Sequence, residues 1–127
     1  MPNARILLIE DNLDNYDLVR FLLQQEGYSV VGAYDGRQGL EMVREAAPDI
    51  VLLDLSIPEI NGWELATQVK ADPATAHVIV IAITGHTLPG DRQRALDAGC
   101  DDYISKPLDI PEFLKTVAAH LPSRQDP

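Results

Sequence analysis

Asp54 stands at a position where a carboxylate can take part in chemistry. It closes the apolar run of residues 50–53, which follows Pro48-Asp49 and is typical of a strand buried in a parallel sheet. Open α/β sheets bind their ligands at the carboxyl ends of such strands. Taken alone, an aspartate at a strand end also fits an ordinary turn.

Matching residues follow two other predicted strands. Glu10 and Asp11 come directly after the apolar run of residues 6–9, and Lys106 comes after residues 103–105. Because parallel strands end at the same edge of a sheet, we expect the three acids and the lysine to converge there. This combination suits a metal-assisted phosphoryl site, where negative charge on phosphoryl oxygens has to be neutralised. The crowding of three carboxylates should raise the pKa of at least one of them.

The composition limits the possible functions. The 127 residues suffice for one domain with a sizeable core but not for two. A net charge of −10 argues against direct nucleic-acid binding and fits divalent cations or basic partner surfaces. Cys100 is the only cysteine, which excludes a disulfide framework and indicates a packing residue. Since the chain shows neither an apolar stretch of membrane-spanning length nor a signal-peptide pattern, we expect a soluble, cytoplasmic protein without a membrane partner.

Strand and helix patterns alternate along the whole chain. Strand patterns cover residues 6–9, 28–33, 50–54, 78–84 and 102–105. The first helical pattern runs through Leu18, Val19, Leu22 and Leu23 until Gly27 stops it, and further helices are predicted at about 36–46, 62–71, 89–98 and 110–120. Asp109 is the expected N-cap of the last helix, with Pro111 in the first turn and Glu112 completing a capping box. The order predicts an α/β fold of (βα)5 type, with a parallel sheet covered on both faces.

Four short sequence motifs occur in order at the predicted strand ends. They are Glu10-Asp11, Asp54 with Pro58 and Gly62, Thr84, and Lys106-Pro107. Through these motifs the chain resembles, along essentially its whole length, the receiver domains of response regulators in two-component signalling. The stretch 98–107 is similar to stand-alone receivers of the cell-division regulator type and to receivers of hybrid kinases. The resemblance implies a flavodoxin-like, doubly wound (βα)5 sandwich with a five-stranded sheet in the order 2-1-3-4-5.

The resemblance also implies roles for the residues at the sheet edge. Asp54 would be the phosphoacceptor that forms an acyl phosphate. Mg²⁺, or Mn²⁺, would bind Asp11, Asp54 and the backbone carbonyl of Ser56, with Glu10 acting through a metal-bound water. Lys106 and Thr84 would supply a positive charge and a hydroxyl to the phosphoryl oxygens. The chain would then label itself from a phosphodonor and lose the group slowly, without being an enzyme in any wider sense.

A switch and its partners are implied in the same way. A cis peptide at Lys106-Pro107 would aim the lysine inward, and Tyr103 would turn inward when the phosphoryl group draws Thr84 over. The face formed by helix 4, strand 5 and helix 5 would report this state to a downstream protein. The phosphodonor would be a histidine kinase or a histidine phosphotransfer protein. We expect a receiver at residues 1–122 and a loose tail at 123–127.

Other interpretations are considered alongside this one. The chain could be a receiver cut from a hybrid kinase, although an initial Met and a loose tail favour a stand-alone protein. A Mg²⁺-dependent phosphohydrolase of the haloacid-dehalogenase type would also use Asp54 as nucleophile, but it needs a second Asp where the chain has Ser56. A flavodoxin would need a phosphate-binding loop where Glu10-Asp11 repels phosphate.

Several residues depart from the family's usual pattern or carry no predicted role. Gly85 stands where the family usually has alanine, which keeps access for the phosphoryl group and should loosen the loop. Ser56 and His86 occupy the variable positions that flank the site and tune how fast water attacks the acyl phosphate. His77, His86 and His120 show no ligand spacing and are predicted to be surface or turn residues.

Overall fold

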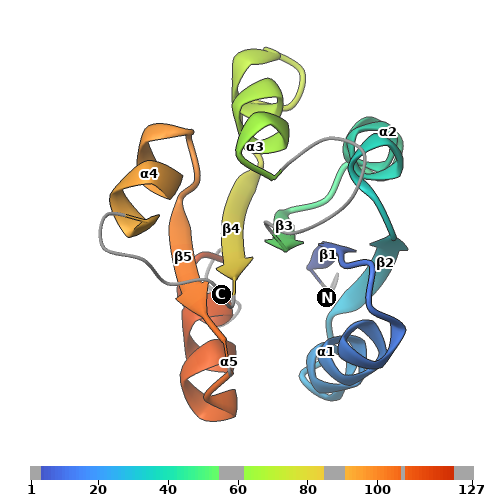
Figure 1. The fold of residues 1–127 in the computed structure, drawn as a ribbon. Helices are drawn as coiled ribbons and strands as arrows, with labels where there is room; N and C mark the ends of the chain where they lie inside the picture. The colour runs from blue at the N-terminus through green and yellow to red at the C-terminus, as the bar shows by residue number, and fades with distance from the viewer. Residues whose placement is uncertain (1–3, 55–61, 85–90, 107, 122–127) are drawn as a thin grey trace, which may run out of the picture.

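A computed structural model describes residues 4–54, 62–84, 91–106 and 108–121. Five strands and five helices alternate along the chain (Figure 1). The strands are β1 (Arg5–Ile9), β2 (Ser29–Ala33), β3 (Ile50–Asp54), β4 (Ile79–Thr84) and β5 (Asp102–Ser105). The helices are α1 (Leu13–Gln25), α2 (Gly36–Ala46), α3 (Gly62–Ala71), α4 (Asp91–Asp97) and α5 (Ile110–Ala119). The predicted (βα)5 order is confirmed.

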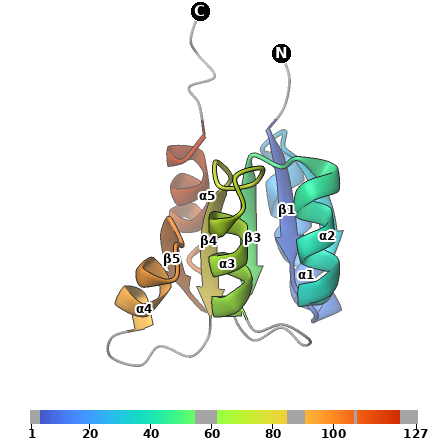
Figure 2. The same cartoon turned by 90° about the horizontal axis from the view of Figure 1, so that it is seen from above.

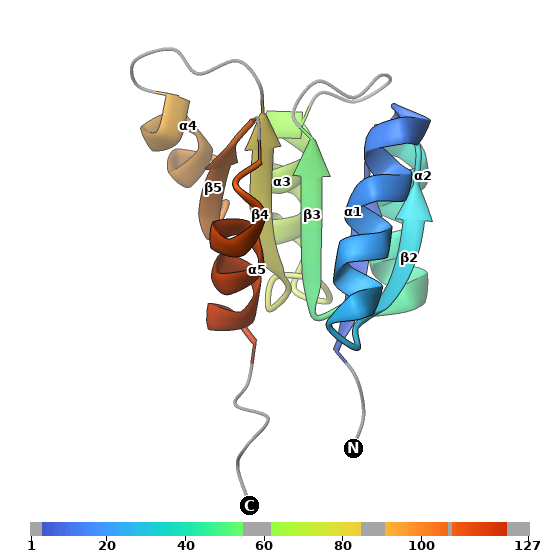
Figure 3. The same ribbon diagram turned by 90° about the horizontal axis from the view of Figure 1, so that it is seen from below.

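All five strands are parallel and lie in the order β2-β1-β3-β4-β5, as expected. The three central strands are almost wholly buried, and every residue of β3 is buried. Their continuous apolar sequences follow from this, because a parallel sheet covered on both faces has no solvent side. Figures 2 and 3 show that the strand arrows all point to one edge of the sheet. Residues that follow the strands are therefore brought together at that edge.

The helices form one layer on each face of the sheet, with α2, α3 and α4 on one side and α1 and α5 on the other (Figure 1). Successive strand residues point to opposite faces and so build two cores. Leu7, Ile9, Val51, Leu53, Val80 and Ala82 pack on the α2–α3–α4 side. Ile6, Leu8, Ile50, Leu52, Ile81 and Ile83 pack with Phe113 on the α1–α5 side.

The helix boundaries follow local capping chemistry. Asp109 accepts a hydrogen bond from the backbone N–H of Glu112, which confirms the predicted N-cap of α5. Gly27, with φ of 91°, follows the end of α1 in a conformation that favours glycine. The buried face of α1 differs in part from the predicted pattern: Tyr16 is buried with Val19 and Leu23, whereas Leu18 is half exposed. None of the helices in the described ranges is long and apolar enough to span a membrane.

Candidate functional site

Three carboxylates meet at the carboxyl edge of the sheet. Glu10 and Asp11 follow β1 and Asp54 ends β3, and these two strands are hydrogen-bonded neighbours with Ile9 opposite Leu53. One oxygen from each carboxylate lies within 4.8 Å of the others. Asp11 is exposed, but the Glu10 and Asp54 residues are only 4% and 5% accessible. Buried carboxylates this close together need a cation, because their charges repel and are poorly solvated.

Lys106 supplies one cation to this cluster. It follows β5, and its backbone N–H donates to the carbonyl of Thr84 over 2.8 Å, which ties the end of β5 to the end of β4. Its Nζ donates to Asp54 Oδ2 at 2.9 Å and lies 3.5 Å from Glu10 Oε1. The predicted convergence of the acidic pair, Asp54 and the lysine is therefore present in the structure. Among the described residues, Glu10 and Asp54 share this ammonium group and Asp11 adds a third carboxylate to the cluster, so carboxylates outnumber the lysine.

The protonation of the cluster reflects burial first and charge second. The pKa of Glu10 is raised to about 7, first by burial and then by the nearby charge of Asp54, which together outweigh the lowering by the Asn12 N–H and by Lys106. For Lys106, burial disfavours the ammonium form, but the hydrogen bond and charge of Asp54 outweigh it and raise the pKa. The sequence correctly predicted a raised carboxyl pKa. That prediction gave the repulsion between crowded carboxylates as the cause of the raised pKa, whereas desolvation by burial is the larger cause.

Backbone contacts hold the acidic loop in place. The N–H of Glu10 donates to the carbonyl of Ala33 on β2, and the N–H of Asn12 donates to Glu10 Oε2 at 3.2 Å. Asn12 is also the N-cap of α1, because its side-chain oxygen accepts from the N–H of Asn15. The start of α1 and the position of the Glu10 carboxylate are thus fixed by the same residue.

Thr84 and Tyr103, to which the resemblance gives switch roles, lie on the neighbouring strands β4 and β5. Thr84 is buried at the carboxyl end of β4, beside β5. Tyr103, opposite Ala82 on β5, is buried in the core on the α2–α3–α4 side. Ser56 and Pro107, to which the resemblance gave a ligand and a switch role, lie outside the described residues, as do Gly85 and His86.

Sequence reasoning missed two side-chain contacts at the opposite edge of the sheet. His120 lies in a turn after α5, as predicted, and its Nε2 also lies 2.9 Å from Asp102 Oδ2 with the side chain partly buried. Lys70 Nζ likewise lies 2.8 Å from Asp101 Oδ2. Each pair joins residues that are far apart in sequence, so no local spacing could have indicated it.

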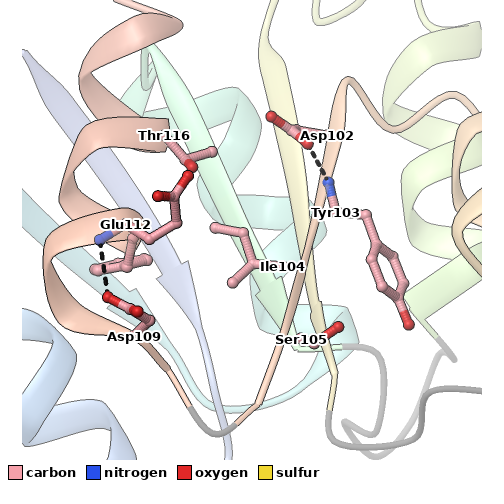
Figure 4. A pocket seen from close by; sticks show the side chains of 8 residues that line it. Asp102, Tyr103, Ile104, Ser105, Asp109, Glu112 and Thr116 are labelled. Carbon is pink, nitrogen blue, oxygen red and sulfur yellow. Dashed lines mark hydrogen bonds between the residues drawn. The ribbon is translucent and has the colours of Figure 1, made fainter.

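Two hollows flank β5 and α5. One, of about 390 Å³, lies between strand and helix; Ile104 points into it and Asp109 and Glu112 stand on its helical side (Figure 4). The other, of about 290 Å³, lies between α1 and the start of α5, where Leu18, Leu22 and Ile110 form part of its apolar wall and Lys106 also lines it.

A (βα)5 fold with acids and a lysine at its carboxyl edge is the arrangement of a receiver domain. The response regulator receiver domain family matches residues 6–118, and the chain belongs to this family. The polar-differentiation response regulator DivK of Brucella anthropi is 36% identical over 121 residues, covering 95% of this chain and 98% of that protein. DivK of Brucella ovis is 36% identical over 116 residues, covering 91% and 94%.

Solved structures agree with this assignment. The receiver domain of a sensor histidine kinase from Pseudomonas aeruginosa, with a magnesium ion coordinated in its active-site cleft, is 30% identical with a TM-score of 0.85, covering 93% of this chain and 97% of that chain. The chemotaxis protein CheY4 of Vibrio cholerae is 27% identical with a TM-score of 0.87, covering 94% and 100%. The chain is a phosphorylation-controlled signalling switch of the two-component type, similar to DivK.

Proposed function

We propose that Asp54 accepts a phosphoryl group from a phosphohistidine donor. The observation that carries this proposal is the geometry of Asp54, a nearly inaccessible carboxylate at a strand end whose Oδ2 is 2.9 Å from the Lys106 ammonium. Attack by an Asp54 oxygen on phosphorus forms an O–P bond and breaks the N–P bond of the donor. The leaving imidazole takes the electron pair and a proton. Lys106 then faces the new phosphoryl oxygens with a fixed positive charge.

A divalent cation fits the remaining charge. Carboxylate oxygens are the ligands that Mg²⁺ prefers, and one from each of Glu10, Asp11 and Asp54 lies within 4.8 Å of the others. Asp11 and Asp54 would bind Mg²⁺ directly, together with the carbonyl of Ser56, and Glu10 would hold a metal-bound water. The ion would neutralise charge on the transferred group. The magnesium ion in the cleft of the Pseudomonas receiver domain supports this choice of metal.

The donor is proposed to dock on the apolar surface of α1. Leu18 and Phe21 are 50% and 57% exposed, and Ile110, at the start of α5, is 41% exposed. Such side chains on an otherwise strongly charged protein mark a contact surface. The hollow beside them is lined by Lys106, which also contacts Asp54. A histidine kinase or histidine phosphotransfer protein bound there would lie next to the acceptor.

The output surface is proposed to be the face of α4, β5 and α5, with the hollow of Figure 4 on it. Thr84 would follow the phosphoryl group, and Pro107 would keep Lys106 aimed at the site. Tyr103 is already buried in the core, so its part in the switch would be a change of packing there rather than a turn inward from solvent. The chain would act as a cytoplasmic switch, with its receiver domain at residues 1–122. Its only catalysis would be its own labelling and slow dephosphorylation.

Intact-mass measurement after incubation with acetyl phosphate and Mg²⁺ tests the proposal. The wild type should gain the mass of one phosphoryl group, and Asp54→Asn, which keeps the shape but loses the charge, should gain none. Asp49→Asn is the matched control, because Asp49 lies at the other end of β3 and accepts a hydrogen bond from the N–H of Arg5. Labelling of Asp54→Asn on another residue would overturn the assignment.

A further inference from the structure

Helix α4 is joined to helix α3 by a cation–π contact. The guanidinium carbon of Arg94 lies 4.4 Å from the centroid of the Trp63 ring. This is well inside the range for such contacts, and tryptophan is the strongest aromatic partner for a cation. Arg20 lies farther from the Tyr16 ring, at 5.9 Å, on the opposite face of the sheet. Arg94 and Trp63 are thus the tighter of the two pairs.

The contact connects the two segments that leave the phosphorylation site. Trp63 is in the first turn of α3, the element that follows Asp54 along the chain. Arg94 is in α4, the element that follows Thr84. A movement of Thr84 relative to Asp54 would act on these two partners through the chain that joins them to the site, and their contact would resist it.

Helix α4 has few other attachments. Among its residues 93–97, only Ala95 is buried, and Leu96 is exposed. Just beyond the helix, Thr67 Oγ1 of α3 donates to the carbonyl of Ala98 at 3.3 Å, a long hydrogen bond. Trp63 packs against the core that also contains Ala95 and Tyr103. Among the described residues, the Arg94–Trp63 contact is therefore one of the few side-chain interactions that hold α4.

We propose that the Arg94–Trp63 contact is a latch that holds α4 in its resting position and opposes the phosphorylated state. This inference rests on the proposed function of Asp54 and Thr84. Loss of the contact destabilises the resting state and so raises the apparent affinity for a phosphoryl mimic. A cation–π contact at an exposed site changes an equilibrium by about two- to fivefold. The expected effects are of that size.

The first measurement uses the unliganded protein. Arg94→Ala should raise amide hydrogen exchange in residues 91–97 by about two- to fivefold. Trp63 is the only tryptophan, so acrylamide quenching of fluorescence reports directly on its ring. Quenching should increase when the guanidinium no longer covers one face. Gln93→Ala is the matched control, since Gln93 is exposed on the same helix and bonds within it to Asp97.

The second measurement titrates beryllofluoride with Mg²⁺ and follows the amide signals of α4 and β5 by NMR. Arg94→Ala should bind the mimic about two- to fivefold more tightly than wild type, with Arg94→Lys in between because lysine keeps the charge without the planar stack. Trp63→Leu should act in the same direction, and the double variant should add little to either single one.

The outcomes separate the latch from the function on which it rests. Exchange and quenching in Arg94→Ala equal to those of Gln93→Ala would overturn the holding role. If wild type responds to beryllofluoride and Arg94→Ala binds it with the same affinity as wild type, the coupling is overturned. A wild type that ignores the mimic altogether would refute the proposed function, and the coupling with it, while the first measurement would still decide whether Arg94 holds α4.

Discussion

The two edges of the sheet carry similar residues but use them differently. At the amino edge each carboxylate has its own partners. Asp101 Oδ2 accepts from Lys70 Nζ and from the N–H of Val80, both at 2.8 Å. Asp102 contacts His120 and the N–H of Tyr103. At the carboxyl edge, Glu10 and Asp54 both contact Lys106, and Asp11 lies in the same cluster of carboxylates.

This difference distinguishes charges that hold the fold together from charges that await a ligand. A carboxylate with matched partners loses little by burial and stabilises the junction of two elements. A cluster with excess negative charge destabilises the protein until a cation or a phosphoryl-driven rearrangement compensates, which is typical of a functional site. Substitutions at the two edges should therefore have opposite effects on stability and different effects on Mg²⁺ binding.

The largest effect is expected for Asp11→Ala. Losing a carboxylate ligand should weaken Mg²⁺ binding by at least the ~10- to 100-fold that loss of an outer-sphere partner costs, and phosphorylation should nearly cease. The fold should persist, because a like charge has been removed from the cluster. Isothermal titration with Mg²⁺ and a thermal melt check both points. If this variant bound Mg²⁺ as tightly as wild type, Asp11 would not be a metal ligand and would only be a residue near the start of α1.

Glu10→Gln should reveal the strain of the metal-free cluster. The pKa of Glu10 is about 7 in the folded protein against an ordinary 4.5, so the folded state binds the extra proton between these values. The stability of the wild type should therefore fall as the pH rises from about 4.5 to 7, and the penalty is complete above 7. At pH 8 without metal, Glu10→Gln should be more stable than wild type by up to about 3 kcal/mol.

Urea unfolding at several pH values in the presence of a chelator measures this difference. The two proteins should converge near pH 4, where both side chains are neutral. Glu41→Gln, at an exposed position of α2, should show no comparable gain. A gain that stayed the same at every pH would contradict the assigned cause.

The amino edge should respond in the opposite direction. Asp101→Ala removes the acceptor of the Val80 N–H and the partner of Lys70, and should lower the free energy of unfolding by about 1–2 kcal/mol. Its Mg²⁺ affinity and labelling by acetyl phosphate should match wild type. Denaturant unfolding and the mass assay test the two statements. If Asp101→Ala bound Mg²⁺ more weakly than wild type, the amino edge would also contribute to metal binding, and the contrast between the two edges would fail.

The sequence predicts the carboxyl edge well for a physical reason. Glu10 and Asp54 directly follow apolar runs and Lys106 follows a short strand pattern, so strand periodicity places all three at one edge. The N-cap at Asp109 is equally local, since the cap and the N–H it accepts from lie within one helical turn. Both features depend on residues that are close together in the sequence, so they can be predicted from it.

The amino edge and the α3–α4 contact lack such a local pattern. Asp102 and His120 are 18 positions apart, and Trp63 and Arg94 lie in different helices. Their pairing depends on how helices pack on the sheet, which periodicity does not encode. The exposure of Leu18 also depends on how a helix packs on the sheet. Tyr16 is buried against Gly32, where a Cβ would clash with the tyrosine ring, and this contact sets the orientation of α1.

Among the proposed site residues, the smallest effect on labelling is expected at Thr84, whose role would be to transmit the signal. Thr84→Ala should be labelled within roughly fivefold of wild type, because one neutral hydrogen bond is worth about 1 kcal/mol while the acids, Lys106 and the metal carry the charge. The α4–β5–α5 face should no longer respond, since the hydroxyl is the contact that distinguishes the phosphorylated state. NMR shifts around Tyr103 on adding beryllofluoride test this, with Thr84→Ser as the control that keeps the hydroxyl. Equal shifts in wild type and Thr84→Ala would remove Thr84 from the switch, and the Arg94–Trp63 contact would then have to sense the site through Asp54 and α3 alone.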